Sequence, residues 1–394
     1  MLNVNIYTIR RNKLIETMRK NSICILYSGQ EYIRNGDIHY SYRQDSDFLY
    51  LTGISSPYCI FVLYKWWEKN DTLCLIFSEP MNEKELLWGT NRMDPFTITQ
   101  ISWIQDIYPQ EKFQEIIQEL IQKDTILYRK DMPFVPNILF EKQEQLGIWE
   151  NIHLLRQIKT LDEIETIKAA IQITHNAYEF LKNTLRPGMF EYEIEAMIAY
   201  IFRRNHSTEA FPSIVASNKN SCTLHYTKHS RKISCNDWLL IDFGAEINGY
   251  AADISRSFLI GKSNKRYMQV FESVQKIKEY AENILHPWIK IADWNKEVKD
   301  MAYTICIELW LKMTEYTPLT NPYFPHSIGH YLGLDTHDVG DRKSALLENM
   351  ILTCEPWIYI PEEWIGIRIE DDIRITHNGI ENLSNCIPIE SLFY

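Results

Sequence analysis

The sequence predicts an α/β domain over residues 1–157 followed by an α+β domain over residues 158–394. In the first part, short apolar runs alternate with helical stretches, a pattern typical of α/β folds. In the second part, long amphipathic helical patterns lie between strands of the hairpin type. A chain of 394 residues is long enough to build two hydrophobic cores.

Three apolar runs in the first part predict strands, at residues 22–28, 59–66 and 72–78. The stretch 112–123 repeats its apolar residues at helical spacing and predicts an amphipathic helix. These elements together favour an α/β arrangement.

The second domain is expected to open with a helix, because Thr160 and Glu163 have the spacing of a capping box. One stripe of this helix is apolar, comprising Ile164, Ile167, Ile171, Tyr178 and Leu181. Pro187 and Gly188 end the connection to a second helix, whose expected buried face is Ile194, Met197, Ile198 and Ile201. Helical patterns at about 264–285 and 297–315 follow.

A hairpin is expected at Asn248-Gly249, which lies between two apolar runs. This dipeptide is a strong hairpin signal because both turn residues must adopt positive φ. A two-residue loop would pair Ile247 with Tyr250, Gly244 with Asp253 and Asp242 with Ser255. Asp242 and Asp253 would then be diagonal neighbours on one face of the hairpin.

The segment 367–375 alternates isoleucine with charged residues and predicts a half-buried strand. Glu370 would share a face with Arg368, whose guanidinium could hold a carboxylate in place or meet substrate. Pro356 biases Glu355 toward an extended backbone, so Glu355 is also expected on a strand.

One set of residues points to a metal site: Asp242, Asp253, His330, Glu355 and Glu370. Four carboxylates in one partly dry cavity would repel one another unless cations or protons neutralised them. Two divalent cations would neutralise them and leave room for a bridging hydroxide. Oxygen-rich ligation with a single histidine suits Mn²⁺ best, and Co²⁺, Fe²⁺ or Zn²⁺ less distinctively.

Taken singly, these residues have simpler interpretations. An aspartate beside an Asn-Gly turn, or an acidic run such as 370–372, is commonly solvated. His326 and His330 have the i, i+4 spacing of zinc proteases, but the glutamate after the first histidine is missing and Gly329 disfavours a helix. We therefore reject that motif, and only the ordered set of ligands is specific.

The ordered set and its surroundings resemble the Xaa-Pro aminopeptidases (aminopeptidase P) of the pita-bread metallopeptidase family. The matching stretches of the second domain are RPGMFEYEIE at 186–195, TLHYT at 223–227, LLIDFGAEINGYAADISRSF at 239–258, HSIGHYLGLDTHDVG at 326–340, LTCEP at 352–356 and GIRIEDDI at 366–373. In the first domain, RNGDIHYSYRQDSDFLYLTG at 34–53 resembles the family's N-terminal domain, which methionine aminopeptidases lack.

The resemblance implies a pita-bread catalytic domain with the four acids and one histidine above as metal ligands. It implies that Glu355 also shuttles protons, and that three histidines line the substrate site: His225, His326 and His337. Arg368 and Asp37 match polar residues near the site. Trp88 lies one place from a tryptophan that many relatives extend into a neighbouring subunit, and Arg342 matches an arginine of the proline pocket.

The expected reaction is release of the N-terminal residue from peptides with proline in second place. A hydroxide that bridges the metals attacks the carbonyl before the second residue. Glu355 carries the proton of the attacking water to the departing nitrogen. His326 and His337 are the candidates for stabilising the oxyanion and handling the leaving nitrogen.

Two departures from the family bear on specificity. The loop 340–348 is shorter than its counterpart and lacks a tyrosine of the pocket wall, and Trp357 replaces a glycine after Glu355-Pro356. Two alternatives stay open. One is a prolidase, in which Arg368 or Arg342 would hold a dipeptide carboxylate; the other is a pita-bread protein that binds peptides or proteins without cleaving them.

Composition excludes several other classes. The net charge of −11 argues against nucleic acid as a partner, and no apolar run approaches the roughly 20 residues of a membrane span. The eight cysteines include no CxxC pair, which predicts buried free thiols in a reducing compartment, and hence a cytoplasmic protein. The family resemblance implies a homo-oligomer, either a dimer or a tetramer.

Overall fold

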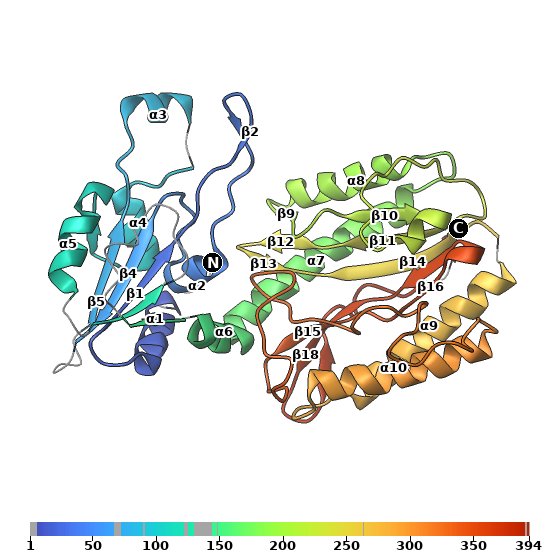
Figure 1. Ribbon diagram of the computed structural model, residues 1–394. Helices are drawn as coiled ribbons and strands as arrows, with labels where there is room; N and C mark the ends of the chain where they lie inside the picture. The colour runs from blue at the N-terminus through green and yellow to red at the C-terminus, as the bar shows by residue number, and fades with distance from the viewer. Residues whose placement is uncertain are drawn as a thin grey trace. The chain divides into compact units, whose positions relative to one another are not determined.

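The computed structural model describes residues 6–66, 72–89, 91–121, 125–129, 144–147, 149–262, 264–390 and 392–393. The chain forms two compact units, Met1–Arg156 and Gln157–Tyr394 (Figure 1). That the chain consists of two domains divided at 157/158 stays a prediction.

A six-stranded mixed sheet is the centre of the first unit, in the order β6-β5-β4-β1-β7-β8. Its strands are β1 (Ser22–Tyr27), β4 (Ile60–Lys65), β5 (Thr72–Phe77), β6 (Asp106–Tyr108), β7 (Ile126–Arg129) and β8 (Gln145–Leu146). The predicted strands are confirmed as β1, β4 and β5. Five of the six residues in β1 are buried, because the sheet is covered on both faces, and this explains their unbroken apolar sequence.

Short helices and one hairpin complete this unit: α1 (Ile6–Thr17), α2 (Ser46–Thr52), α3 (Glu83–Trp88), α4 (Pro95–Ser102), η1 (Gln110–Lys112), α5 (Phe113–Leu120), α6 (Trp149–Gln157), β2 (Ile33–Asn35) and β3 (Ile38–His39). Helix α5 confirms the helix predicted at 112–123, and it packs Phe113, Ile117 and Leu120 against the sheet. It ends earlier than expected, at Leu120; residues 122–123 lie outside the described residues.

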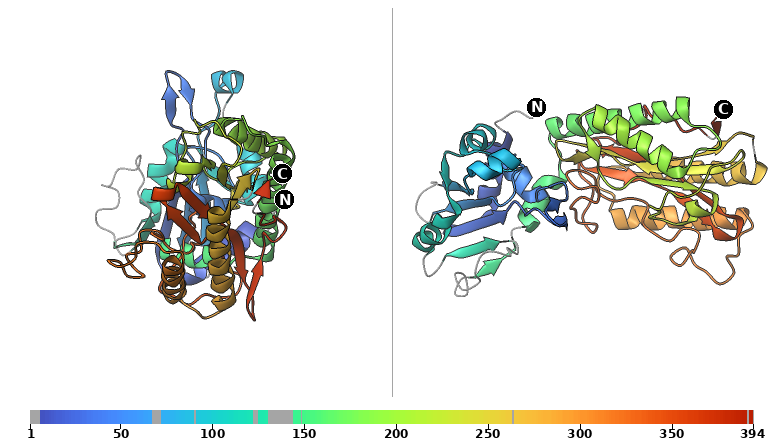
Figure 2. Two further views of the ribbon diagram at one scale, coloured as in Figure 1. Left: turned by 90° about the vertical axis from the view of Figure 1, so that its right-hand side faces the viewer. Right: turned by 90° about the horizontal axis from the view of Figure 1, so that it is seen from above.

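In the second unit, two pairs of helices enclose several short sheets (Figures 1 and 2). The first pair is α7 (Leu161–Thr184) and α8 (Glu191–Arg204), and the second pair is α9 (Lys265–Ile284) and α10 (Ile291–Glu308). The strands between them are β9 (Thr208–Glu209), β10 (Ile214–Ser217), β11 (Trp238–Phe243), β12 (Ala245–Ile247), β13 (Tyr250–Ala251), β14 (Ile254–Ile260), β15 (Ile351–Cys354), β16 (Trp357–Ile360), β17 (Ile365–Arg368), β18 (Asp371–Ile375), β19 (Ile380–Asn382) and β20 (Leu392–Phe393). Two short 3₁₀ helices are η3 (Asn218–Cys222) and η4 (Pro361–Glu363).

The helix predictions hold well in this unit. The capping box of Thr160 and Glu163 is present at the start of α7, and the predicted apolar stripe of that helix is buried. In α8 the predicted face is buried except Met197, which is half-buried. The helix predicted at 297–315 is wrong in its bounds, because α10 begins at Ile291 and ends at Glu308, two residues before Trp310 adopts a left-handed backbone.

The hairpin at Asn248-Gly249 is present, and both residues have positive φ, at 52° and 83°. The expected pairs Ile247 with Tyr250 and Asp242 with Ser255 are confirmed. A Cβ at Gly244 would lie 1.7 Å from the carbonyl oxygen of Ala252. Glycine is therefore required here, where the two arms of the hairpin approach closely.

The predicted strand over 367–375 is interrupted. β17 ends at Arg368 and β18 begins at Asp371, and the partner strands β15 and β16 are separated at Glu355 and Pro356. At this break, the amide of Glu370 donates to the carbonyl of Ser255 (3.1 Å), and the amide of Glu355 donates to the carbonyl of Ile328 (2.9 Å). Both acids thus turn away from a regular ladder to bond other segments, so neither lies within a strand as predicted.

Candidate metal centre

The candidate ligands lie at strand ends that converge in the second unit. Asp242 is on β11, and Asp253 directly precedes β14. Glu355 directly follows β15, and Glu370 lies between β17 and β18. His330 lies in the loop paired with β15 through a bridge between Tyr331 and Leu352.

Three of these side chains could bind one ion together. One donor atom from each of Asp253, His330 and Glu370 lies within 4.8 Å of the other two. Nε2 of His330 is 3.4 Å from Oδ2 of Asp253 and 3.7 Å from Oε1 of Glu355. The structure therefore gathers an imidazole and carboxylates from four separate stretches of sequence.

The orientation of His330 is set by its neighbours. Its backbone N–H donates to the Thr353 hydroxyl (3.1 Å), and Nδ1 lies 3.0 Å from the carbonyl oxygen of Tyr331. Because a carbonyl oxygen can only accept, Nδ1 carries the hydrogen in this contact. The lone pair of Nε2 is left to face the acids, as metal ligation requires.

Arg368 connects two of the candidate ligands. Its buried guanidinium donates to Oδ2 of Asp242, to the hydroxyl of Tyr359 (2.5 Å) and to the hydroxyl of Ser255 (2.7 Å). Ser255 in turn donates to Oε2 of Glu370 (2.7 Å). Of the two uses expected for Arg368, the geometry favours holding carboxylates in place.

The charge balance of the cluster calls for cations. Burial is the first cause that raises the pKa of Asp253, Glu355 and Glu370, and repulsion from nearby carboxylates raises the pKa of each further. Oδ1 of Asp242 is buried and has no hydrogen-bond partner among the described residues. Divalent ions would supply the missing positive charge and a partner for that oxygen, so the residues fit a metal site.

The three histidines assigned to the substrate site lie around this cluster. His326 stacks on Trp357 with an interplanar angle of 19°, and the His337 ring centroid is 4.2 Å from that of His330. Burial and the charge of Arg368 lower the pKa of His326 to about 3. Burial and His330 lower the pKa of His337, and His225 contributes to both shifts. His326 and His337 therefore favour the neutral form.

The residues assigned to the substrate pocket are exposed. Arg342 lies in a turn and is close enough to His337 to lower that residue's pKa. Asp37 is in the turn between β2 and β3, and Trp88 is the last residue of α3 with 75% of its surface exposed. Both residues belong to the first unit.

Sequence reasoning missed four residues that support the cluster: Ser255, Thr353, Tyr359 and Asp372. Asp372 is fully buried and accepts the backbone N–H of Asp253 (3.2 Å). The acidic run at 370–372 is therefore buried and structured, in contrast to the solvated strand end that such a run usually forms. Ser255, Thr353 and Asp372 could have been found from the sequence, because each lies two residues from a predicted ligand on an extended segment.

Comparison with known proteins gives the family. Residues 165–377 match the model of metallopeptidase family M24, and residues 7–128 match the aminopeptidase P N-terminal domain. The Xaa-Pro aminopeptidase of Haemophilus influenzae is 32% identical over 406 residues, covering 97% of this chain and 94% of that protein. The chain belongs to the Xaa-Pro aminopeptidases of family M24.

Other relatives agree with this membership. The Xaa-Pro aminopeptidase of Escherichia coli is 31% identical and covers 95% of this aminopeptidase and 93% of its own length. A structure of Zn-substituted E. coli aminopeptidase P in complex with product superposes with a TM-score of 0.91 at 28% identity, covering 99% of this chain and 96% of that one. The comparisons give no support to a prolidase or to a non-catalytic binding protein.

This aminopeptidase is thus a metal-dependent exopeptidase with a pita-bread catalytic domain, as the sequence predicted. In the described part of the chain, no helix combines the length and apolar character needed to cross a membrane.

The cysteines are free as expected, but Cys235 and Cys386 are exposed. The prediction of buried thiols is therefore wrong for these two, because they lie outside the apolar runs that form the cores.

Proposed function

We propose that this aminopeptidase uses two divalent ions, with Mn²⁺ preferred, to release the first residue of peptides that have proline in second place. The observation that supports this most is the convergence of Asp253, His330 and Glu370, with Glu355 3.7 Å from the same histidine nitrogen. The names of the relatives support the proline preference.

The proposed ligands are Asp242, Asp253, His330, Glu355 and Glu370. Two ions bound there would lower the pKa of a water molecule and polarise the scissile carbonyl. The donor set is oxygen-rich, with one imidazole and no thiolate, which suits Mn²⁺.

The remaining chemistry is assigned to side chains of this chain. Glu355 receives the proton of the attacking water and passes it to the proline nitrogen, which has no hydrogen of its own. His326 and His337 contact the oxyanion and the leaving nitrogen, and Arg368 holds Asp242.

The specificity residues are proposals as well. Arg342 would border the proline pocket, and His225 would line the substrate site together with His326 and His337, the two histidines whose pKa is lowered. Asp37 and Trp88, both residues of the first unit, are also proposed to contribute to substrate binding. We also propose a homo-oligomer, a dimer or a tetramer, and a cytoplasmic location, since the free thiols suit a reducing compartment.

Hydrolysis of an Xaa-Pro-Yaa tripeptide, compared with the matching Xaa-Ala-Yaa, tests the proposal. Metal-stripped protein should be inactive, and added Mn²⁺ should restore release of the first residue from the proline peptide only. Glu355→Ala should abolish cleavage, whereas Glu363→Ala, which removes a surface carboxylate paired with Arg266, should not. Uptake of two ions without cleavage of either peptide would contradict the proposed reaction, and cleavage of Xaa-Pro dipeptides alone would point to a prolidase.

A further inference from the structure

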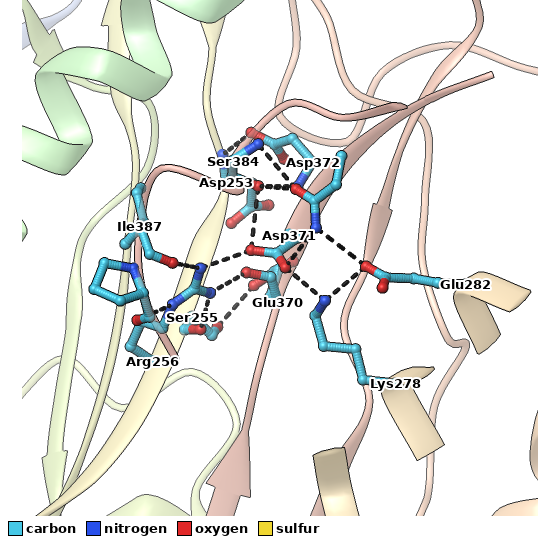
Figure 3. A network of polar contacts seen from close by, with 12 residues as sticks. Asp253, Ser255, Arg256, Lys278, Glu282, Glu370, Asp371, Asp372, Ser384 and Ile387 are labelled. Carbon is cyan, nitrogen blue, oxygen red and sulfur yellow. Dashed lines mark hydrogen bonds and ion pairs between the residues drawn. The ribbon is translucent and has the colours of Figure 1, made fainter. Parts of the chain in front are cut away.

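A buried charge network lies beside the candidate metal centre (Figure 3). At its middle is Asp371, which directly follows the candidate ligand Glu370 and has 2% of its surface exposed. Oδ1 of Asp371 accepts from Arg256 (2.7 Å), and Oδ2 contacts Nζ of Lys278 (2.6 Å). Both cations are themselves almost completely buried.

Arg256 connects this network to the backbone of the ligand. Nη1 donates to the carbonyl of Glu370 (2.6 Å) and to that of Ser255 (3.0 Å). Its other nitrogens donate to the carbonyls of Ile387 (2.6 Å) and Pro388 (3.1 Å). One side chain thus holds the main chain of Glu370 against β14 and against the C-terminal segment.

Lys278 connects the same carboxylate to helix α9. Its ammonium group also contacts Glu282 (2.6 Å), one turn further along that helix. Asn382 donates to both acids, at 2.9 Å to Asp371 and 3.2 Å to Glu282. The hydroxyl of Ser384 donates to the other oxygen of Asp371 (3.2 Å). Asp371 is therefore held from three directions, by α9, by β14 and by the end of β19 with the residues that follow it.

The pairing of β15 with β18 extends this restraint to Glu355, a second candidate ligand. Asp371 pairs with Cys354 across β15 and β18, and the amide of Ile369 donates to the carbonyl of Pro356 (3.2 Å). Glu370 and Glu355 lie between these two contacts, where the ribbon opens. An anchor at Asp371 therefore limits the movement of both acids at the break.

Stability alone is a weak reason for such a network. Desolvating buried ions costs several kcal/mol each, so apolar residues of similar volume often stabilise a fold as well or better. What fixed, fully bonded ions provide is a defined position. Successive residues of an extended chain point to opposite faces, so an anchor on Asp371 orients Glu370 toward the cluster.

We propose that Asp371, bound by Arg256 and Lys278, is a positioning residue that sets the places of Glu370 and Glu355 for metal binding. This inference rests on the proposed function, because it takes those two acids as ligands. Residues that orient ligands from behind typically contribute roughly 10- to 100-fold to metal affinity.

Calorimetric titration of Mn²⁺ into the metal-stripped full-length protein tests the inference. Asp371→Asn and Lys278→Met should each weaken Mn²⁺ binding by roughly 10- to 100-fold. Cleavage of the proline tripeptide should recover substantially at saturating Mn²⁺, because the catalytic groups are intact. The matched control is Asp47→Asn in the first unit, whose equally buried carboxylate accepts from Arg156 at 2.6 Å. The control should lower the melting temperature and leave Mn²⁺ affinity unchanged.

The outcomes separate the two proposals. If the parent protein binds no Mn²⁺ and cleaves nothing, the proposed function fails. If the parent binds Mn²⁺ and cleaves, but folded Asp371→Asn and Lys278→Met bind Mn²⁺ with parental affinity, only the positioning role is overturned. If Asp371→Asn does not fold, the Mn²⁺ affinity of Lys278→Met decides whether the positioning role stands. That variant should fold, because Asp371 keeps Arg256, Asn382 and Ser384 as partners.

Discussion

Arg368 shows how a single side chain organises the candidate centre. Its guanidinium is buried and bonds Asp242, Ser255 and Tyr359 at once. The planar fork of arginine suits this arrangement, because its donors diverge in fixed directions. The residue is 4% exposed and each of its three side-chain nitrogens is already bonded, which argues against Arg368 as an anchor for a substrate carboxylate.

We expect Arg368→Lys to impair the enzyme although the charge is kept. A lysine ammonium cannot reach three divergent acceptors, so Asp242 and Glu370 would lose their common support. We expect a decrease of roughly 10- to 100-fold in Mn²⁺ affinity or kcat. Steady-state kinetics measure kcat, and Mn²⁺ titration measures the affinity. Arg374→Lys is the control, since Arg374 bonds Asn349 and the partly exposed Glu381. Parental values in Arg368→Lys would refute the supporting role.

At the scale of elements, the centre is built where an antiparallel ribbon opens. Strands β15 and β16 on one side, and β17 and β18 on the other, pair regularly on both sides of Glu355 and Glu370. At the opening, the amides of these acids bond Ile328 and Ser255 instead. The break thus brings the loop of His330 and strand β14 against the ribbon, and the candidate ligands meet there.

Close contact between this loop and β15 leads to a second prediction. A Cβ at Gly329 would lie 2.1 Å from the carbonyl oxygen of Thr353, which is backbone and cannot rotate away. Gly329→Ala should therefore displace His330, destabilise the fold by about 1–3 kcal/mol and weaken metal binding. Gly379→Ala is the matched control, because nothing lies within 4 Å of its added Cβ. Denaturant unfolding and Mn²⁺ titration measure both effects, and equal behaviour of the two variants would contradict the packing argument.

At the scale of the whole molecule, stability should depend on pH through the acids of the centre. Burial first, then mutual repulsion, raises the pKa of Asp253 and Glu370 well above 3.8 and 4.5. At pH values between the ordinary pKa and the raised pKa of these acids, the native state binds more protons than the unfolded state. The free energy of unfolding of the metal-free protein should then fall as pH rises through this window.

Melting temperatures measured from pH 4 to pH 8, with and without Mn²⁺, test this dependence. Below the ordinary pKa values of the acids their contribution is fully present, and it is lost as pH rises toward the raised values. Mn²⁺ would bind the ionised acids, so it should raise the melting temperature most at the upper end of this pH range and reduce the loss of stability there. His326 and His337, whose pKa values are lowered from 6.5, act in the opposite direction below that pH. A metal-free protein whose melting temperature rises steadily from their ordinary pKa to the upper end of the range would therefore contradict the shifts of the acids.

Much of the molecule was predictable from sequence wherever the cause is local. The capping box of Thr160 and Glu163 marks a helix start, because it needs only four residues to form. The Asn248-Gly249 turn sets the pairing of Asp242 with Ser255, because a two-residue loop fixes the register. The family of the chain, and with it the expected metal ligands, followed from motifs of the same short range.

Tertiary structure alone decided what depends on contacts between distant segments. The alternation at 367–375 predicts one strand, yet the strand is interrupted at Glu370. The amide of Glu370 instead donates to the carbonyl of Ser255, which is 115 positions away in the sequence. Likewise, no local pattern distinguishes Asp371, held by Arg256 and Lys278, from a solvated acid. The sequence by itself therefore determined most of the elements, the family and the candidate ligands. The fold decided which acids are buried and bonded, because burial and pairing arise only when remote strands and helices meet.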